Sequence, residues 1–489
     1  MKNVLIICLL FLIPNQILSE TSSYSYSSYS ATKTDESSTS GTISNTNSDE
    51  SAVYITKSGI TISDTTITKS GDSSSTENSE FYGVNAAILV NGGGLTMTDG
   101  SISTSGKGAN AIVATNGGTV TITGTEITST GSSSARGLHA TYGGTITATD
   151  VTISSQGGSC ATLATDRGEG TVSCTNCELT TNGAGSPIIY STGTITITDT
   201  TGTSNAAQAV VVEGKNSATI KSSTLQCTAS PNNKNDECGV LIYQSQSGDA
   251  DTGTSTFTCE SSTIEILSTS SYYSSAPMFY VTNTAANIAL TDCEFTFGSG
   301  TFLNAATGSW GTSGSNGGTV TMTLTNQDIE GDIVVDSSSS LTLTLVNSSI
   351  KGKINSAKEA AKLAITLDSD STLTLTGNSY YTSITNEDST GNNINYGNNY
   401  SFTKSDEKEI NRSSGNGNQN RNPPNGSGTP PSGSGTPPNG NEVGSMGVGG
   451  NNNDNQANED EDEAIIAKYF SSNQNFLKFT YLLFVFILL

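Results

Sequence analysis

The residues best suited to chemistry in this sequence gather in one short stretch, and they are Arg136, His139, Tyr142, Asp166, Arg167 and Glu169. Segments 138–142 and 162–166 share one pattern, so we expect neighbouring strands with Tyr142 beside Asp166. An arginine, a carboxylate and an aromatic ring can together hold a sugar by charge-assisted hydrogen bonds and ring stacking. Asp166 and Arg167 are also weak candidates for acid–base catalysis. A surface ion pair without function is the alternative.

Polar residues also recur at one place after successive aliphatic segments. Stacked in register, they would form a column of Asn91, Asn116, Tyr142, Asp166, Thr192, Glu213 and Gln244. Tyr190 and Tyr280 are expected to share a second column, one strand position inward. Hydrogen-bonding groups flanked by aromatic rings suit a long glycan. A register shift of one residue would turn every side chain to the other face. The ligand-binding candidates are Arg136, His139, Tyr142, Asp166, Arg167, Tyr190, Glu213 and Tyr280.

The charge balance excludes several classes of partner. The chain of 489 residues has 20 Lys+Arg against 44 Asp+Glu, a net charge of −24, which disfavours phosphate contacts. Aromatic residues make up 6%, too few for a stacking platform, so no nucleic acid partner is expected. An acidic column could bind Ca²⁺, but other residue types interrupt it. We therefore interpret these acids as turn residues and expect no metal or cofactor; they are Asp64, Asp99, Asp150, Asp199 and Asp292.

A repeat of about 25 residues organises the middle of the chain. Each unit has an aliphatic segment, a Gly-rich corner, a Thr-rich alternating segment, an Asp or Asn corner, and a short third segment. Residues 111–113, 117–118, 119–123 and 126–128 form one such unit, with a Gly at its second corner. Three strands and three corners per unit predict an all-β fold, a parallel β-helix of about twelve coils. Because only alternate strand residues face inward, 33% hydrophobic residues are enough for its core.

The unit, Gly-Gly-Thr-ϕ-Thr-ϕ-Thr-Asp-x-x-ϕ with ϕ apolar, resembles the right-handed parallel β-helix proteins of the pectin-lyase-like superfamily over roughly residues 50–385. Within it, the chain looks most similar to Ser/Thr/Gly-rich adhesin-like or carbohydrate-binding surface proteins of bacteria and protists. The resemblance implies a right-handed coil. It also implies that an enzyme of this kind would use clustered carboxylates with Ca²⁺, and a basic residue such as Arg167 as proton acceptor. Because the superfamily includes lyases, hydrolases, binding modules and adhesins, it does not choose among these functions.

The two ends of the chain predict a location. Residues 1–19 have the layout of a secretory signal peptide. Residues 464–489 end in a short apolar tail, which indicates a GPI attachment signal or, alternatively, a short transmembrane tail. Between them we expect a leader or N-terminal cap at 20–50, the β-helix at 51–400, and a disordered Pro/Gly/Ser/Asn and acidic stalk at 401–463. The protein is thus expected to be secreted and attached to the outer face of the cell membrane.

Cysteines and glycosylation sequons fit an exported protein. The chain has eight Cys, of which Cys8 lies in the predicted signal peptide, so an odd number remains and at least one thiol is unpaired or bonded between molecules. Cys227 and Cys238 are the disulfide candidates, because they would close one long loop. Cys174-x-x-Cys177 could suggest zinc, but the sequence nearby completes no set of four ligands. Sequons occur at Asn347, Asn399, Asn411 and Asn425.

We interpret the chain as a cell-surface-tethered, adhesin-like binding protein whose repetitive flank recognises extracellular carbohydrate or another cell surface. One alternative is a polysaccharide lyase or hydrolase acting on an acidic glycan, and another is a passive coat or spacer. An enzyme needs several acids and a base converging on one or two adjacent coils, whereas a binder needs a repetitive ladder. The scarcity of charge and the repetition favour the binder.

Overall fold

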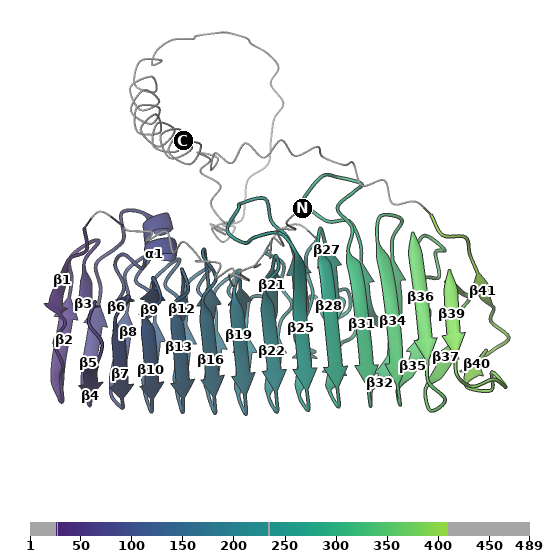
Figure 1. Ribbon diagram of the computed structural model, residues 1–489, viewed down its shortest axis with the longest axis horizontal. Coiled ribbons are helices and arrows are strands. Elements are labelled where there is room, and N and C mark those ends of the chain that lie inside the picture. The colour runs from purple at the N-terminus through teal and green to yellow at the C-terminus, as the bar shows by residue number, and fades with distance from the viewer. Residues whose placement is uncertain (1–25, 27, 233–234, 409–489) are drawn as a thin grey trace, which may run out of the picture. The chain divides into compact units, whose positions relative to one another are not determined.

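The computed structural model describes residues 26, 28–232 and 235–408, and this part of the chain is almost entirely parallel β-strand (Figure 1). It contains 41 strands and one helix. Strands that are distant in sequence lie side by side in three long sheets, an arrangement consistent with the parallel β-helix expected from the sequence. The predicted signal peptide, the anchor region and most of the predicted stalk lie outside the described residues.

Two sheets are the longest. Sheet A has 12 strands, in spatial order β1 (Ala31–Thr34), β3 (Ser51–Ile55), β6 (Ile88–Asn91), β9 (Ile112–Thr115), β12 (Leu138–Ala140), β15 (Leu163–Thr165), β18 (Ile189–Ser191), β21 (Val210–Glu213), β24 (Val240–Tyr243), β27 (Phe279–Thr282), β30 (Thr301–Ala305) and β33 (Asp332–Val335). Sheet B has 13 strands, β4 (Ile60–Ser63), β7 (Gly94–Thr98), β10 (Thr119–Thr123), β13 (Thr145–Thr149), β16 (Thr171–Thr175), β19 (Thr194–Thr198), β22 (Ser217–Lys221), β25 (Thr254–Glu260), β28 (Ala285–Thr291), β31 (Thr319–Thr325), β34 (Ser340–Val346), β36 (Lys362–Leu367) and β39 (Ser383–Asn386).

Sheet C, the third long sheet, and two small sheets complete the fold. Sheet C has ten strands, β2 (Gly41–Asn45), β5 (Thr65–Lys69), β8 (Ser101–Thr104), β11 (Glu126–Ser129), β14 (Thr152–Ser155), β17 (Glu178–Thr181), β20 (Thr201–Ser204), β23 (Thr224–Cys227), β26 (Thr263–Ile266) and β29 (Glu294–Thr296). Sheet D contains β32 (Asp328–Glu330), β35 (Ser349–Gly352), β37 (Thr372–Leu375) and β40 (Ile394–Asn395), and a final pair is β38 (Ser379–Tyr381) with β41 (Phe402–Lys404).

From β3 to β29, each coil takes a strand from each of sheets A, B and C in turn, and in the two coils that follow the third strand belongs to sheet D. The core of a coil comes from alternate residues, as Leu138, Ile146 and Ile153 show for the coil of β12, β13 and β14; each is at most 1% exposed. One continuous cluster of buried side chains runs from Ile43 to Leu373 through all of these coils. Because each strand contributes only its inward residues, the core is narrow, and few apolar residues per coil are needed.

The interpretation of the five Asp residues as turn residues is confirmed, because each lies at a corner that follows a strand of sheet B. All eleven of these corner residues have left-handed backbone, with φ between 43° and 64°; those before sheet C strands are Asp64, Asp99, Gly124, Asp150, Asn176, Asp199, Ser222, Ser261 and Asp292, and those before sheet D strands are Asn326 and Asn347. Neighbours in this column bond to one another: Asn176 Nδ2 donates to Asp150 Oδ1, and Asn347 Nδ2 donates to Asn326 Oδ1 at 2.8 Å. Asp and Asn are favoured here because their side chains tolerate this backbone and bond locally.

The strands extend beyond the boundaries expected from the sequence. β1 and β2 lie within segment 20–50 and pair with β3 and β5, so this segment already belongs to sheets A and C. In β2 the alternation around Ile43, which is 4% exposed, supplies the inward residue that such a coil needs. At the other end, β41 lies inside the predicted stalk segment 401–463 and pairs with β38.

The outer faces of sheets A and B differ. On sheet B, outward Thr121, Thr147, Ser173 and Thr196 lie in register on successive strands and are exposed or half-buried. On sheet A, Gly83 at the end of helix α1 (Thr76–Tyr82) lies against the outward side chains of Leu89 and Val113. Over part of its length, sheet A is therefore covered on both faces, by the core on its inner face and by residues at the end of α1 on its outer face.

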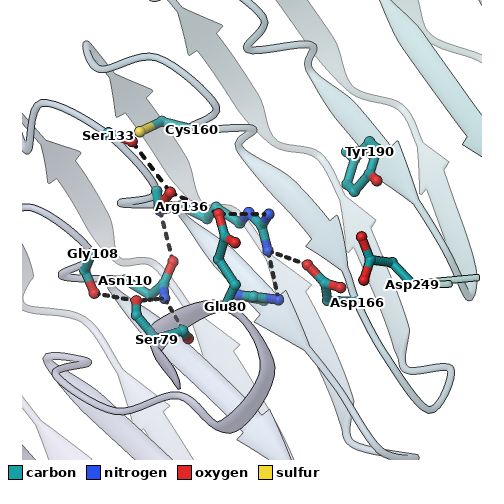
Figure 2. A network of polar contacts seen from close by, with 12 residues as sticks. Ser79, Glu80, Gly108, Asn110, Ser133, Arg136, Cys160, Asp166, Tyr190 and Asp249 are labelled. Atoms are coloured by element: carbon teal, nitrogen blue, oxygen red, sulfur yellow. Dashed lines mark hydrogen bonds and ion pairs between the residues drawn. The ribbon is translucent and has the colours of Figure 1, made fainter. Parts of the chain in front are cut away.

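Local signals explain why α1 forms. Ser75 is its N-cap and accepts a hydrogen bond from the Asn78 amide, while Gly83 ends it with φ 71°. Ser79 Oγ donates to the Gly108 carbonyl at 2.5 Å, and Asn110 Nδ2 donates to the Ser79 carbonyl at 3.1 Å (Figure 2). These buried bonds fix the helix to the coil of β9.

Candidate binding site

The outward residues of sheet A form a column in register that crosses the candidate site. His139 lies opposite Ala164, which lies opposite Tyr190. Tyr190 continues through Val211 and Leu241 to Tyr280. The prediction that Tyr190 and Tyr280 share a column is confirmed.

The predicted register next to this column was wrong by one residue in places. Leu138 pairs with Leu163, so the two segments are offset by 25 residues and Tyr142 donates its amide to the Arg167 carbonyl. Tyr142 thus lies opposite Arg167 rather than Asp166. The pairing of two leucines in the core decides the register, because a slip would expose both.

The same correction applies elsewhere in the predicted polar ladder. Asn91 lies opposite Thr115, and Glu213 lies opposite Tyr243, so Asn116 and Gln244 are each one position outside the column. The turn after each sheet A strand varies in length, and residue counting across it fails for this reason.

Arg136 is the centre of a buried charge cluster (Figure 2). Its Nη1 lies 2.7 Å from Asp166 Oδ2 and 3.0 Å from His139 Nε2, and its Nη2 lies 3.4 Å from Glu80 Oε1. The side chains of the three charged residues are each 4% exposed. The structure thus joins three of the predicted residues and adds Glu80, which α1 supplies.

Burial determines the protonation of this cluster. It raises the pKa of Asp166 to about 7, because the attraction of Arg136 is offset by the like charges of Asp249 and Glu80. Burial and then the Arg136 charge hold the pKa of His139 well below its usual value, so its imidazole is neutral. Arginine can only donate, so His139 Nε2 accepts, and Nδ1 has no partner among the described residues. Although burial opposes it, the Glu80 and Asp166 charges raise the pKa of Arg136.

Three other candidates from the sequence serve mainly to hold α1 and the nearby loops. The Arg167 guanidinium lies 3.8 Å from the centre of the Phe81 ring, and its Nε lies 3.1 Å from Asp249 Oδ1. Tyr142 stacks on Tyr82, with ring centroids 5.8 Å apart. Glu169 pairs with Lys215 at 2.5 Å on the surface.

A pocket opens beside the charge cluster on the outer face of sheet A. It has about 610 Å³ of atom-free space including its mouth. Its walls combine the rings of Tyr190, Tyr243 and Trp310 with an aliphatic floor, and its polar lining residues include Arg136, Gln208, Asn232 and Asp236. Rings with a few fixed polar groups are the usual composition of a small-molecule site.

Hydrogen bonds behind the wall orient the rings. Glu213 accepts from Tyr190 Oη at 2.7 Å, from Tyr243 Oη at 2.8 Å, and from Ser245 Oγ. Burial raises the pKa of Glu213 more than these three donors lower it. The ring of Trp310 lies 5.3 Å from that of Tyr243, and its buried Nε1 finds no acceptor among the described residues.

The predicted ligand-binding residues therefore divide into groups. Arg136 and Tyr190 line the pocket, whereas His139, Asp166 and Glu213 are bonded to lining residues without lining it. Tyr280 Oη donates to the Thr307 carbonyl at 3.1 Å and so supports the loop of Trp310. The sequence interpretation missed the lining residues Gln208, Tyr243, Asp236 and Trp310. Trp310, the single tryptophan of the chain, was the signal that could have drawn attention to this loop.

The cysteine pairing differs from the one expected. Cys174 and Cys177 form a disulfide, whereas Cys227 and Cys238 are free and buried. Cys227 belongs to the main core cluster, and Cys238 belongs to a separate cluster with Tyr243 and Tyr280. Their side chains therefore pack against different sets of buried residues.

The described residues cover part of the remaining features that the sequence suggested. Of the sequons, Asn347 and Asn399 are exposed, and Asn411 and Asn425 lie outside the described residues. In residues 26, 28–232 and 235–408, no group of three or more His, Cys, Asp or Glu is placed to hold a metal ion. The same residues include no helix long and apolar enough to cross a membrane.

Comparison with known proteins does not name a family. No family model, no curated protein and no solved structure matches this chain.

Proposed function

We propose that the pocket on the outer face of sheet A binds a sugar unit of an extracellular glycan, and that the protein is a surface-tethered, adhesin-like binder. The observation that carries this proposal is that Tyr190, Tyr243 and Trp310 line the same pocket as Arg136, Gln208 and Asp236. Aromatic rings stack on the apolar faces of sugars, while fixed polar groups bond their hydroxyls.

The ligand fits this pocket best when it carries no negative charge. Among the described lining residues, Asp236 is the one acid and Arg136 the one base. The Arg136 guanidinium already contacts Glu80 and Asp166. A uronic acid would have to compete with two buried carboxylates for it, and it would also meet Asp236. A neutral or amino sugar avoids both costs.

A second candidate, acid–base chemistry on a glycan, is favoured by one observation. Asp166 has a pKa of about 7 and lies beside Arg136, a combination typical of catalytic sites. However, Asp166, Glu80 and Glu213 do not line the pocket, so a substrate there would contact the ring and guanidinium groups instead. We therefore prefer binding.

The wider setting is part of the same proposal. The signal peptide at 1–19 would export the protein. The stalk and the apolar end at 464–489 would then tether it with the β-helix facing outward. The repeat supports a right-handed coil of the pectin-lyase-like kind.

A glycan panel tests the proposal. The full chain is applied to neutral, amino and uronic oligosaccharides, together with Trp310→Ala and the control Tyr396→Ala, because Tyr396 is 47% exposed and is not part of the pocket lining. We expect binding to neutral or amino sugars that Trp310→Ala weakens about tenfold, or about 1.4 kcal/mol, and that the control leaves unchanged. Absence of binding to the whole panel would contradict the proposal, and preference for oligogalacturonate would contradict its charge argument.

An activity assay separates the second candidate. Release of shortened or unsaturated oligosaccharides by the native chain, abolished in Asp166→Asn, would establish catalysis in place of simple binding.

A further inference from the structure

Two free cysteines on neighbouring coils touch each other. Cys259 lies near the end of β25, and Cys293 follows the corner residue Asp292 in the next coil. Their Sγ atoms are 2.8 Å apart, and the residues are 0% and 7% exposed. Of the five free cysteines in the described residues, these are the two whose sulfur atoms contact each other.

The positions of this pair match those of the disulfide that the structure already contains. Cys174 is in register with Cys259 through Ile197 and Ile220 on the intervening strands of sheet B. Cys177 and Cys293 each come directly after a left-handed corner residue. The corner between sheets B and C thus places these two positions within reach of one another. The difference is that Cys174–Cys177 lies within one coil, whereas Cys259 and Cys293 belong to successive coils.

We propose that Cys259 and Cys293 are a second disulfide site, which joins the coil of β25 to the coil of β28 when the protein meets an oxidising disulfide. A bond there would add a covalent link between two coils that otherwise share hydrogen bonds and packing. These coils include β24 and β27, which carry Tyr243 and Tyr280 beside the pocket. The inference does not depend on the proposed function.

The chemistry of the pair gives the two sulfurs different roles. A hydrogen bond joins Cys293 Sγ and Cys259 Sγ, and it lowers the pKa of Cys293 while raising that of Cys259. Cys293 is also the more exposed of the two. It is therefore the attacking thiolate, and Cys259 completes the bond.

The exchange balances with a low-molecular-weight disulfide as oxidant. The Cys293 thiolate attacks one sulfur of this disulfide, forms a mixed disulfide and releases one thiolate. Cys259 then loses its proton and attacks Cys293 Sγ, which forms the protein disulfide and releases the second thiolate. The two protein protons go to the two leaving thiolates, and the oxidant is reduced to two thiols.

Peptide mapping tests this inference on the full chain. The reduced protein is treated with oxidised glutathione, alkylated and cleaved with chymotrypsin, because no Lys or Arg lies between Lys234 and Lys351 whereas several aromatic residues and leucines do. We expect a Cys259–Cys293 cross-linked peptide and, in Cys293→Ala, an alkylated Cys259. Alkylation of both cysteines in the oxidised native chain, or a bond from either to another cysteine, would overturn the proposal.

A stability measurement provides a second criterion that does not rely on peptide recovery. In a Cys174→Ala/Cys177→Ala background, a reductant should lower the unfolding midpoint of the oxidised protein. Adding Cys259→Ala and Cys293→Ala should remove this effect of the reductant. An equal effect in both backgrounds would contradict a disulfide at this site.

Discussion

Arg136 and Asp166 form an ion pair between neighbouring coils, with 2.7 Å between Nη1 and Oδ2, and both side chains are 4% exposed. Glu80 of helix α1 lies 3.4 Å from the same guanidinium. One base thus serves two acids in a nearly dry environment, which favours a proton on one of them. This arrangement joins α1 to sheet A at the edge of the pocket.

The protonation of Asp166 predicts a pH dependence of stability. Its pKa is about 7 in the folded protein and near 4 in the unfolded chain, so the folded state holds more protons between these values. Stability from this group is therefore fully present below pH 4 and falls as the pH rises to 7, by about 1.4 kcal/mol for each pKa unit. Urea unfolding from pH 4 to 8 should show a smaller decline in Asp166→Asn than in the native chain. Equal slopes would contradict the assigned proton.

Removing the base should be far more costly than removing an exposed one. Arg136→Met leaves Glu80 and Asp166 buried without their cation, and we expect a loss of about 3–5 kcal/mol in the free energy of unfolding. Lys221→Met is the matched control, because its 3.1 Å pair with Glu260 is more than 40% exposed and should contribute at most about 1 kcal/mol.

Adding Glu80→Gln and Asp166→Asn to Arg136→Met should recover part of the loss, because the unpaired charges are then removed. If Arg136→Met lowered the free energy of unfolding no more than Lys221→Met does, the charge cluster would have no structural role.

The corner column makes a prediction about backbone conformation. Asp150 has φ 55°, and both Asp150→Gly and Asp150→Val lose the hydrogen bond to Asn176. The difference in free energy of unfolding between the two variants therefore measures the cost of a left-handed backbone for a residue other than Gly. The Val variant should be about 1 kcal/mol less stable than the Gly variant by chemical unfolding. At Thr147, an exposed position of β13, the order should reverse, because Val is favoured in a strand and Gly is not. The same order at both positions would contradict the corner assignment.

Much of the fold could be predicted because its signals are local. Asp or Asn at a corner and an apolar residue three positions later act within one coil, and the pairing of Ile127 with Ile153 repeats that phase from coil to coil. The segment containing β2 was harder to assign, because its single strong inward residue, Ile43, stands among Ser and Thr.

The site was less predictable because long-range insertions complete it. Glu80 comes from a helix inserted between sheet C and sheet A strands, and Trp310 comes from the loop between β30 and β31. Neither follows the repeat, so no periodicity places them beside Arg136. The predicted register at Tyr142 was wrong for a related reason, because the turns that separate the strands differ in length from coil to coil.

Fluorescence of Trp310 tests the central claim most directly, because it is the only tryptophan of the chain and it lines the pocket. Titration of the full-length protein with a neutral or amino oligosaccharide should give a saturable change in its emission. The same titration with oligogalacturonate should give a much weaker change. Glycan binding detected by calorimetry without any change in this emission would place the ligand elsewhere and contradict the account.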